Sequence, residues 1–198
     1  MIGCRSVHRA ATVMAVAVLL PSALSAAGGD PSKAGAYCPL PEPGEVPQCL
    51  APAKARFGDF FAAVEAGGVD DSESLQLEAA LAGSGAGEEA YLALSSLTYG
   101  YYRLAQRAAA DPAARPELAA RLDRWNQILL RAYSESESNP EFQQAVRLAA
   151  GDLDSKAPGI APRGSLLQLI SQADGRSSGM RGALEGVVGR IFGEEKRE

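Results

Sequence analysis

Hydrophobic residues recur along this chain at the three- and four-residue steps of an α-helix. No segment shows the strict alternation or the enrichment in β-branched residues that is typical of a strand. The strongest pattern lies in residues 90–108, where the apolar positions form one seam: Ala90, Leu94, Leu97, Tyr101, Leu104 and Ala108. Four more residues widen this stripe on one flank: Tyr91, Thr98, Tyr102 and Ala105. Because a stripe this wide can contact two neighbours, we expect this helix to lie centrally.

Two helices are predicted before this one. The first carries four apolar residues at helical spacing: Phe57, Phe60, Phe61 and Val64. Gly67-Gly68 ends it, because glycine disfavours the helical conformation. The second is shorter, follows Asp71 and ends near Gly83. It carries three leucines: Leu75, Leu77 and Leu81.

Two helices are also predicted after it. Pro112 and Pro116 interrupt the pattern, and proline is favourable in a first helical turn, so the next helix begins at Pro116. Its apolar residues repeat the same steps: Leu118, Leu122, Trp125, Leu129 and Ala132. The short connection favours an antiparallel hairpin. Asn139-Pro140 then caps a further helix with four apolar residues: Phe142, Ala145, Val146 and Ala149.

The C-terminal part of the chain is predicted to begin with an irregular linker over residues 151–163. Ser165-x-x-Gln168 is a capping box before a short helix with four apolar residues: Leu166, Leu167, Ile170 and Ala173. The last predicted helix carries a stripe of glycines: Gly182, Gly186, Gly189 and Gly193. Each interior glycine costs about 1 kcal/mol of helix stability. This segment is therefore either a frayed tail or a helix docked closely on its own domain, on a partner or on a membrane surface.

Together these patterns predict an all-α fold, a small antiparallel bundle of about five to seven helices with a disulfide-stapled, proline-rich N-terminal arm. The predicted organisation has five parts: a signal peptide (1–27), the arm (28–50), a helical core (51–150), a linker (151–163) and a C-terminal helical segment (164–198).

The first 27 residues are typical of a secretory signal. Arg5 and Arg9 give it a positive head, the apolar run Ala10–Leu20 follows, and Ser25-Ala26-Ala27 supplies small residues for cleavage. The alternative is an uncleaved anchor, but the run is about half of the roughly 20 residues that a spanning helix needs. We therefore expect a periplasmic or secreted protein with no stable membrane insertion after cleavage.

Cys38 and Cys49 flank a stretch with four prolines, CPLPEPGEVPQC. Because exported chains meet an oxidising compartment, we expect these cysteines to pair. A bridge across so short a loop contributes about 3 kcal/mol of stability. It would act either as a staple between the arm and the first helix or as a support for a recognition loop.

Candidate catalytic chemistry is scarce, because the only histidine, His8, lies in the predicted signal. Without it the chain lacks the imidazole of Ser-His-Asp and Cys-His sites, and two cysteines cannot close a zinc site. Removal of the signal changes the net charge from −5 to −7, since that segment carries two arginines and no acid. An acidic chain is poorly suited to nucleic acid. We expect no catalytic residue, metal or cofactor.

Two short motifs resemble ligand-binding loops, but we interpret both as connections between helices. Asp152-x-Asp154 begins like a calcium loop, but Lys156 occupies the next ligand position, so we interpret it as part of a solvated linker. Gly83-x-Gly85-x-Gly87 precedes a helix as phosphate cradles do. Glu88 and Glu89 would repel a phosphate there, and we interpret the glycines as a flexible connection.

The leading functional hypothesis is an exported, non-catalytic helical protein that binds a partner protein or acts as an accessory in the cell envelope. The stapled loop is one candidate contact surface. Five residues are candidate partner contacts: Leu92, Tyr99, Gly182, Gly186 and Gly189. Leu92 and Tyr99 are apolar positions on an otherwise polar helix face, and they would meet either a third helix or a partner chain. The alternatives are a carboxylate-dependent envelope hydrolase acting on cell-wall glycan and a helical-repeat scaffold.

Overall fold

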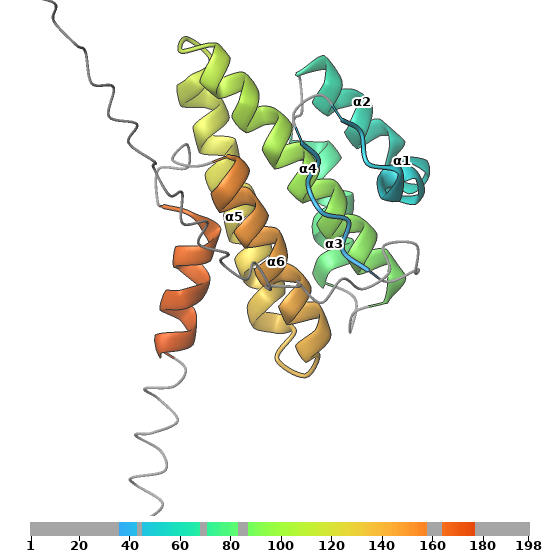
Figure 1. Cartoon of the computed structure of the whole chain (residues 1–198), viewed down its shortest axis with the longest axis vertical. Coiled ribbons are helices and arrows are strands. Elements are labelled where there is room, and N and C mark those ends of the chain that lie inside the picture. Colours follow the sequence, from blue (N-terminus) through green and yellow to red (C-terminus); the bar gives the residue numbers. More distant parts are fainter. Residues whose placement is uncertain (1–35, 43–44, 68–70, 83–86, 158–163, 177–198) are drawn as a thin grey trace, which may run out of the picture.

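A computed structural model describes residues 36–42, 45–67, 71–82, 87–157 and 164–176 of the chain (Figure 1). These residues form helices and connections without a strand, so the predicted fold class is confirmed. The helices are η1 (Gln48–Leu50), α1 (Ala51–Arg56), α2 (Gly58–Ala66), α3 (Asp71–Ala82), α4 (Glu88–Ala110), α5 (Arg115–Glu135) and α6 (Pro140–Lys156). A further helix covers residues 166–176. The predicted signal peptide and glycine-striped helix lie outside the described residues.

Helix α4 is the centre of the bundle, as its wide stripe predicts. It packs against α1, α2, α3, α5 and α6. Its buried positions include hydroxyl side chains as well as apolar ones, and each hydroxyl donates to the carbonyl four residues earlier: Ser95 to Tyr91 at 2.8 Å, Ser96 to Leu92 at 2.7 Å and Thr98 to Leu94 at 2.7 Å. Because these polar groups are satisfied within the helix, α4 can be buried on nearly all sides without an unpaired hydroxyl.

The α4–α5 hairpin and the start of α6 follow the predicted turn chemistry. Asp111 accepts a hydrogen bond from the amide of Ala113 at 2.9 Å in the short connection, and α5 has its proline in the first turn. Asn139 caps α6 by accepting from the amide of Phe142 at 3.0 Å, and Pro140 opens the helix. Figure 1 shows α4, α5 and α6 running side by side.

The structure differs from the expected first and last helices of the core. The helix expected around Phe57 is two helices, since Phe57 leaves the helical conformation between α1 and α2 (φ −122°, ψ 42°). Leu75 on α3 is 53% exposed, whereas Leu77 and Leu81 are buried. The prediction of an irregular linker is wrong for residues 151–156, which belong to α6. Leu153 is 4% exposed and extends the buried stripe of α6 by a further turn.

The helix over residues 166–176 begins with the predicted capping box. The amide of Gln168 donates to the Ser165 hydroxyl at 3.3 Å, and the amide of Ser165 donates to the Gln168 side chain at 3.2 Å. Leu166 and Ile170 are buried. The opposite end is held by Asp174, which accepts from the Tyr133 hydroxyl at 2.8 Å and pairs with Arg147 at 3.0 Å.

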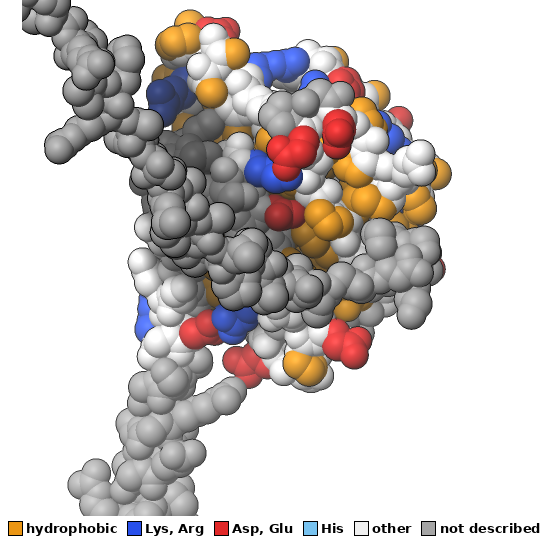
Figure 2. Space-filling model, in the orientation of Figure 1, with side chains coloured by type: hydrophobic (Ala, Val, Ile, Leu, Met, Phe, Trp, Pro, Cys, Tyr) orange, Lys and Arg blue, Asp and Glu red, His pale blue; other side chains and the backbone are white. Residues whose placement is uncertain are grey.

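Four large hydrophobic side chains of the described residues remain exposed: Val46 (59%), Leu75 (53%), Leu148 (51%) and Leu167 (37%). Figure 2 shows hydrophobic side chains also gathered over α1. In the described part of the chain, no helix combines the length and the apolar character that crossing a bilayer requires.

Gly100 allows α4 to approach α2 and α5 closely. A Cβ atom there would lie 2.5 Å from the Phe60 ring and 3.2 Å from the Trp125 ring, and these two rings already pack with centroids 5.6 Å apart. We expect Gly100→Ala to destabilise the fold by about 1–3 kcal/mol through overpacking, despite alanine's better helix propensity.

Gly151→Ala is the matched control for this prediction, because Gly151 is also in a helix but a Cβ atom there meets nothing within 4 Å. It should stabilise the protein by up to about 1 kcal/mol. Urea unfolding followed by circular dichroism measures both changes. Equal effects of the two substitutions would contradict the close approach at Gly100.

Candidate functional site

The candidate site is the N-terminal arm and the disulfide that holds it against the bundle. Cys38 and Cys49 form a disulfide with their Cα atoms 5.6 Å apart and 11 positions apart in sequence. Cys38 is 4% exposed, and Cys49, in η1, packs partly buried against the core. We call residues 36–42 the docked arm. The disulfide fixes this arm beside the start of α1, as expected for a staple.

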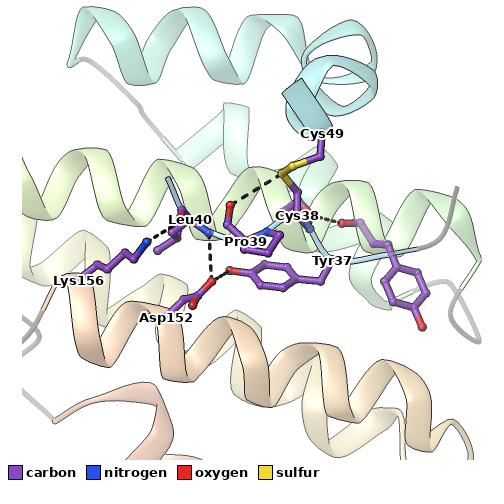
Figure 3. The surroundings of a disulfide bond; sticks show 9 residues. Tyr37, Cys38, Pro39, Leu40, Cys49, Asp152 and Lys156 are labelled. Carbon is purple, nitrogen blue, oxygen red and sulfur yellow. Dashed lines mark hydrogen bonds between the residues drawn. A yellow bond between two sulfur atoms is a disulfide. The ribbon is translucent and has the colours of Figure 1, made fainter. Parts of the chain in front are cut away.

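The docked arm is extended, and side chains of α4 and α6 bind its backbone (Figure 3). The amide of Cys38 donates to the Ser95 hydroxyl at 3.0 Å. The amide of Leu40 donates to the Asp152 carboxylate at 3.0 Å, and the Tyr37 hydroxyl donates to the same oxygen at 2.9 Å. One carboxylate of α6 therefore holds two points of the arm.

Lys156 completes the contact one helical turn beyond Asp152. Its Nζ donates to the Leu40 carbonyl at 2.7 Å and lies 3.0 Å from the Glu42 carboxylate. The amide and the carbonyl of Leu40 are thus both bound by α6, and Figure 3 shows Asp152 and Lys156 reaching toward the arm from the same side. This pairing replaces the hydrogen bonds that an extended segment would otherwise make with a neighbouring strand.

The role of Asp152 corrects the expectation that it lies in a solvated linker. The extension of α6 places Asp152 and Lys156 four residues apart, so both side chains lie on one face of the helix. Asp154 is exposed on another face. Helical spacing is the signal that distinguishes the two acids, because it places Asp152 but not Asp154 on the face of Lys156. The interpretation of these residues as a linker did not use this spacing.

The environment of Tyr37 favours its neutral form. Burial raises the pKa of Tyr37 well above its usual value, and the charge of Asp152 and the hydrogen bond to it raise it further. Burial also raises the pKa values of four other tyrosines: Tyr91, Tyr99, Tyr101 and Tyr133. Three of these hydroxyls, those of Tyr37, Tyr99 and Tyr133, donate to carboxylates of other elements. The Tyr101 hydroxyl instead accepts from the Asn126 side chain.

Four exposed apolar residues follow the docked arm in the chain. Val46 lies in the loop before η1, and Ala51, Pro52 and Ala55 lie on α1, over which Figure 2 shows hydrophobic side chains gathered. We call these four residues the exposed patch. The loop is turned by a hydrogen bond from the amide of Glu45 to the Glu42 carbonyl at 3.1 Å. Sequence reasoning named the loop but not Val46, because a single valine among prolines carries no periodic signal.

The predicted partner contacts are placed differently. Tyr99 is 1% exposed and packs against α2, with its ring 5.7 Å from that of Phe61 and its hydroxyl 3.5 Å from Glu65. Of the two alternatives for Tyr99, the structure shows a further helix of the same chain. Leu92 packs partly buried against the core. Gly182, Gly186 and Gly189 lie outside the described residues.

An open groove of about 420 Å³ lies between α2 and α3. Asp59 and Glu73 line it, together with Phe60, Ser72 and Gln76. The hydrolase alternative requires two acids across a groove, and these helices supply that pair. Asp59 is exposed to solvent, however, whereas a general acid is typically shielded from water. Within the described ranges, no group of three or more His, Cys, Asp or Glu residues is arranged to hold a metal ion.

Comparisons with protein-family models, curated proteins and solved structures found no match to this chain.

Asp152→Ala should destabilise the protein by about 1–3 kcal/mol, because it removes a charged acceptor from two arm donors and leaves the Tyr37 hydroxyl buried without its partner. Asp154→Ala is the matched control on the same helix turn and should change stability by less than about 0.5 kcal/mol. Urea unfolding of both variants measures the difference. A loss as large for Asp154→Ala would show that the arm contact is not the cause.

The stability should also fall at alkaline pH. Because the pKa of Tyr37 is raised on folding, its contribution is complete below the unfolded pKa of about 10 and is lost as the pH rises toward the folded value. One such group changes the unfolding free energy by about 1.36 kcal/mol per pH unit in that window. Tyr37→Phe should make the decline between about pH 10 and 12 shallower by up to that amount, in urea titrations at each pH. An unchanged slope would contradict the assignment.

Proposed function

We propose that this protein is exported and acts without catalysis by binding another protein of the cell envelope through the exposed patch. Val46 carries the proposal. It is 59% exposed, the highest value among the large hydrophobic residues that the structure describes, and it lies in the loop that the disulfide closes.

The contacts within the closed loop support binding. The disulfide joins Cys38 to Cys49, and the amides of Glu45 and Leu50 donate to the Glu42 and Pro47 carbonyls, each at 3.1 Å. Ordering a free loop on binding costs affinity for each immobilised residue, and these contacts reduce that cost for the residues that they hold. An apolar side chain on such a support is typical of an interface anchor.

The charges around the patch indicate the kind of partner. Glu42 and Glu45 are exposed on the loop, and Lys156 is engaged with Glu42 and the arm. A partner that presents an apolar contact to Val46 and a basic residue toward Glu45 would complement this surface.

Export is supported by the disulfide, since structural disulfides persist in oxidising compartments. The signal-like first 27 residues support the same location. The first part of the test is the intact mass of the unreduced protein recovered from producing cells. We expect a chain that begins at Gly28 and is two hydrogen masses lighter than its reduced form. A cytoplasmic chain that retains Met1 and free thiols would contradict the proposal.

The second part of the test is site-specific photocrosslinking in those cells. A photoreactive residue in place of Val46 should give one discrete crosslinked product. The same residue in place of Leu75 is the control, because Leu75 is 53% exposed on α3, outside the patch. Equal products from the two positions, or none from position 46, would overturn the proposed binding surface.

A further inference from the structure

Asn126 on α5 is a polar side chain enclosed by the bundle, with 0% of its surface exposed. Its Nδ2 donates to the Gly164 carbonyl at 3.4 Å and to the Tyr101 hydroxyl at 3.5 Å. Among the residues that the structure describes, no donor lies within hydrogen-bond distance of its Oδ1. A buried acceptor in this state has lost its hydration without compensation, so the arrangement indicates a further hydrogen-bond partner.

The orientation of the Asn126 amide is fixed by Gly164. Rotating the amide by half a turn would place its oxygen against the Gly164 carbonyl, so that two acceptors would face each other. The nitrogen therefore faces Gly164 and Tyr101, and the oxygen requires a donor from another source.

The Tyr101 hydroxyl, on α4, has the complementary requirement. Tyr101 is 4% exposed, and its hydroxyl accepts from Asn126 but donates to no acceptor within the described ranges. Burial raises the pKa of Tyr101, the hydrogen bond from Asn126 lowers it and the charge of Asp123 raises it, with a net upward direction. The hydroxyl therefore keeps its hydrogen at neutral pH. Because Asn126 and Tyr101 are in contact, this donor and the Asn126 acceptor lie close together.

A molecule that satisfies both groups must offer a hydrogen and a lone pair. An ammonium group has hydrogens for Asn126 but no lone pair for Tyr101, and a carboxylate has the reverse. Water has both, and buried waters typically make about three hydrogen bonds to groups that lack other partners. The Asp123 carboxylate, three residues before Asn126 on the same face of α5, is a further acceptor close enough for its charge to act on Tyr101.

We propose that one buried water molecule is bound between α4 and α5, where it accepts from the Tyr101 hydroxyl and donates to Asn126 Oδ1. This water joins the two helices at the point where Asn126 also holds Gly164, just before the helix over residues 166–176. It is a structural ligand of the bundle. The inference does not depend on the proposed function, because none of these residues belongs to the exposed patch.

A crystal structure of the unreduced protein, at a resolution that defines ordered water, tests the site directly. We expect a water oxygen at about 2.6–3.2 Å from both Asn126 Oδ1 and the Tyr101 hydroxyl oxygen. A protein donor bound to Asn126 Oδ1, or electron density without a water peak at this position, would overturn the proposal.

Oxygen-17 magnetic relaxation dispersion tests the same site in solution, because its amplitude is proportional to the number of long-lived buried waters. Asn126→Leu and Tyr101→Phe should each lower the amplitude by that of one water, since each removes a partner of the bound molecule. Thr98→Val is the matched control and should leave the amplitude unchanged. It also removes a buried hydroxyl from α4, but that hydroxyl donates to the Leu94 carbonyl within the helix.

Circular dichroism confirms that each variant is folded before the amplitudes are compared. An amplitude that stays unchanged in either Asn126→Leu or Tyr101→Phe, or an equal loss in Thr98→Val, would contradict a water bound at this position.

Discussion

The structure depends on the nearly complete burial of α4. A helix surrounded by five others must satisfy its own polar side chains and keep its neighbours close without overlap. Its buried hydroxyls bond to carbonyls one turn earlier, and Gly100 leaves room for the Phe60 and Trp125 rings. The other elements pack against different side chains of α4. It presents aromatic rings toward α2, small side chains where the packing is closest, and a hydrogen-bonded hydroxyl toward the arm.

The docked arm contacts three elements of the bundle: η1, α4 and α6. It is tied to η1 by the disulfide, to α4 by Ser95 and to α6 by Asp152 and Lys156. The residues of the arm are too few to form an independent element, and their backbone groups must find partners because they are partly buried. Side chains from α4 and α6 provide those partners. The disulfide adds an entropic contribution by restricting the unfolded chain, so the covalent and the hydrogen-bonded contacts favour the same closed position.

The helical period predicted the elements of the core, but it could not predict what covers each face. The seam of α4, the Asn139 cap and the Ser165–Gln168 capping box follow from local rules, because the interacting groups lie within one turn of each other. Tyr99 lies on the face of α4 that looks polar in sequence. That face can be buried because the Ser95 and Ser96 hydroxyls bond within their own helix, although a pattern of hydrophobic positions counts serine as polar.

The contacts of the arm were beyond sequence reasoning for a different reason. Tyr37 and Asp152 are 115 positions apart, and a pair at such a distance leaves no spacing by which it can be recognised. The predicted linker begins at Gly151, whereas α6 continues to Lys156, and the burial of Leu153 compensates the modest cost of a helical glycine. Contacts between residues that are far apart in sequence can therefore be recognised only once the fold is known, even where each residue stands out in the sequence by itself.

The proposed binding function depends on the contacts that hold the docked arm. A binding surface gains affinity when its residues are held before the partner arrives, and a short segment cannot bury a core of its own. Here a disulfide and one acidic side chain of a distant helix hold the arm, and Val46 is exposed in the loop that follows it. An oxidising compartment is the setting in which this arrangement is stable, because the loss of the disulfide would restore the freedom that the arm contacts alone must then oppose. The proposed location and the proposed function therefore depend on the same bond.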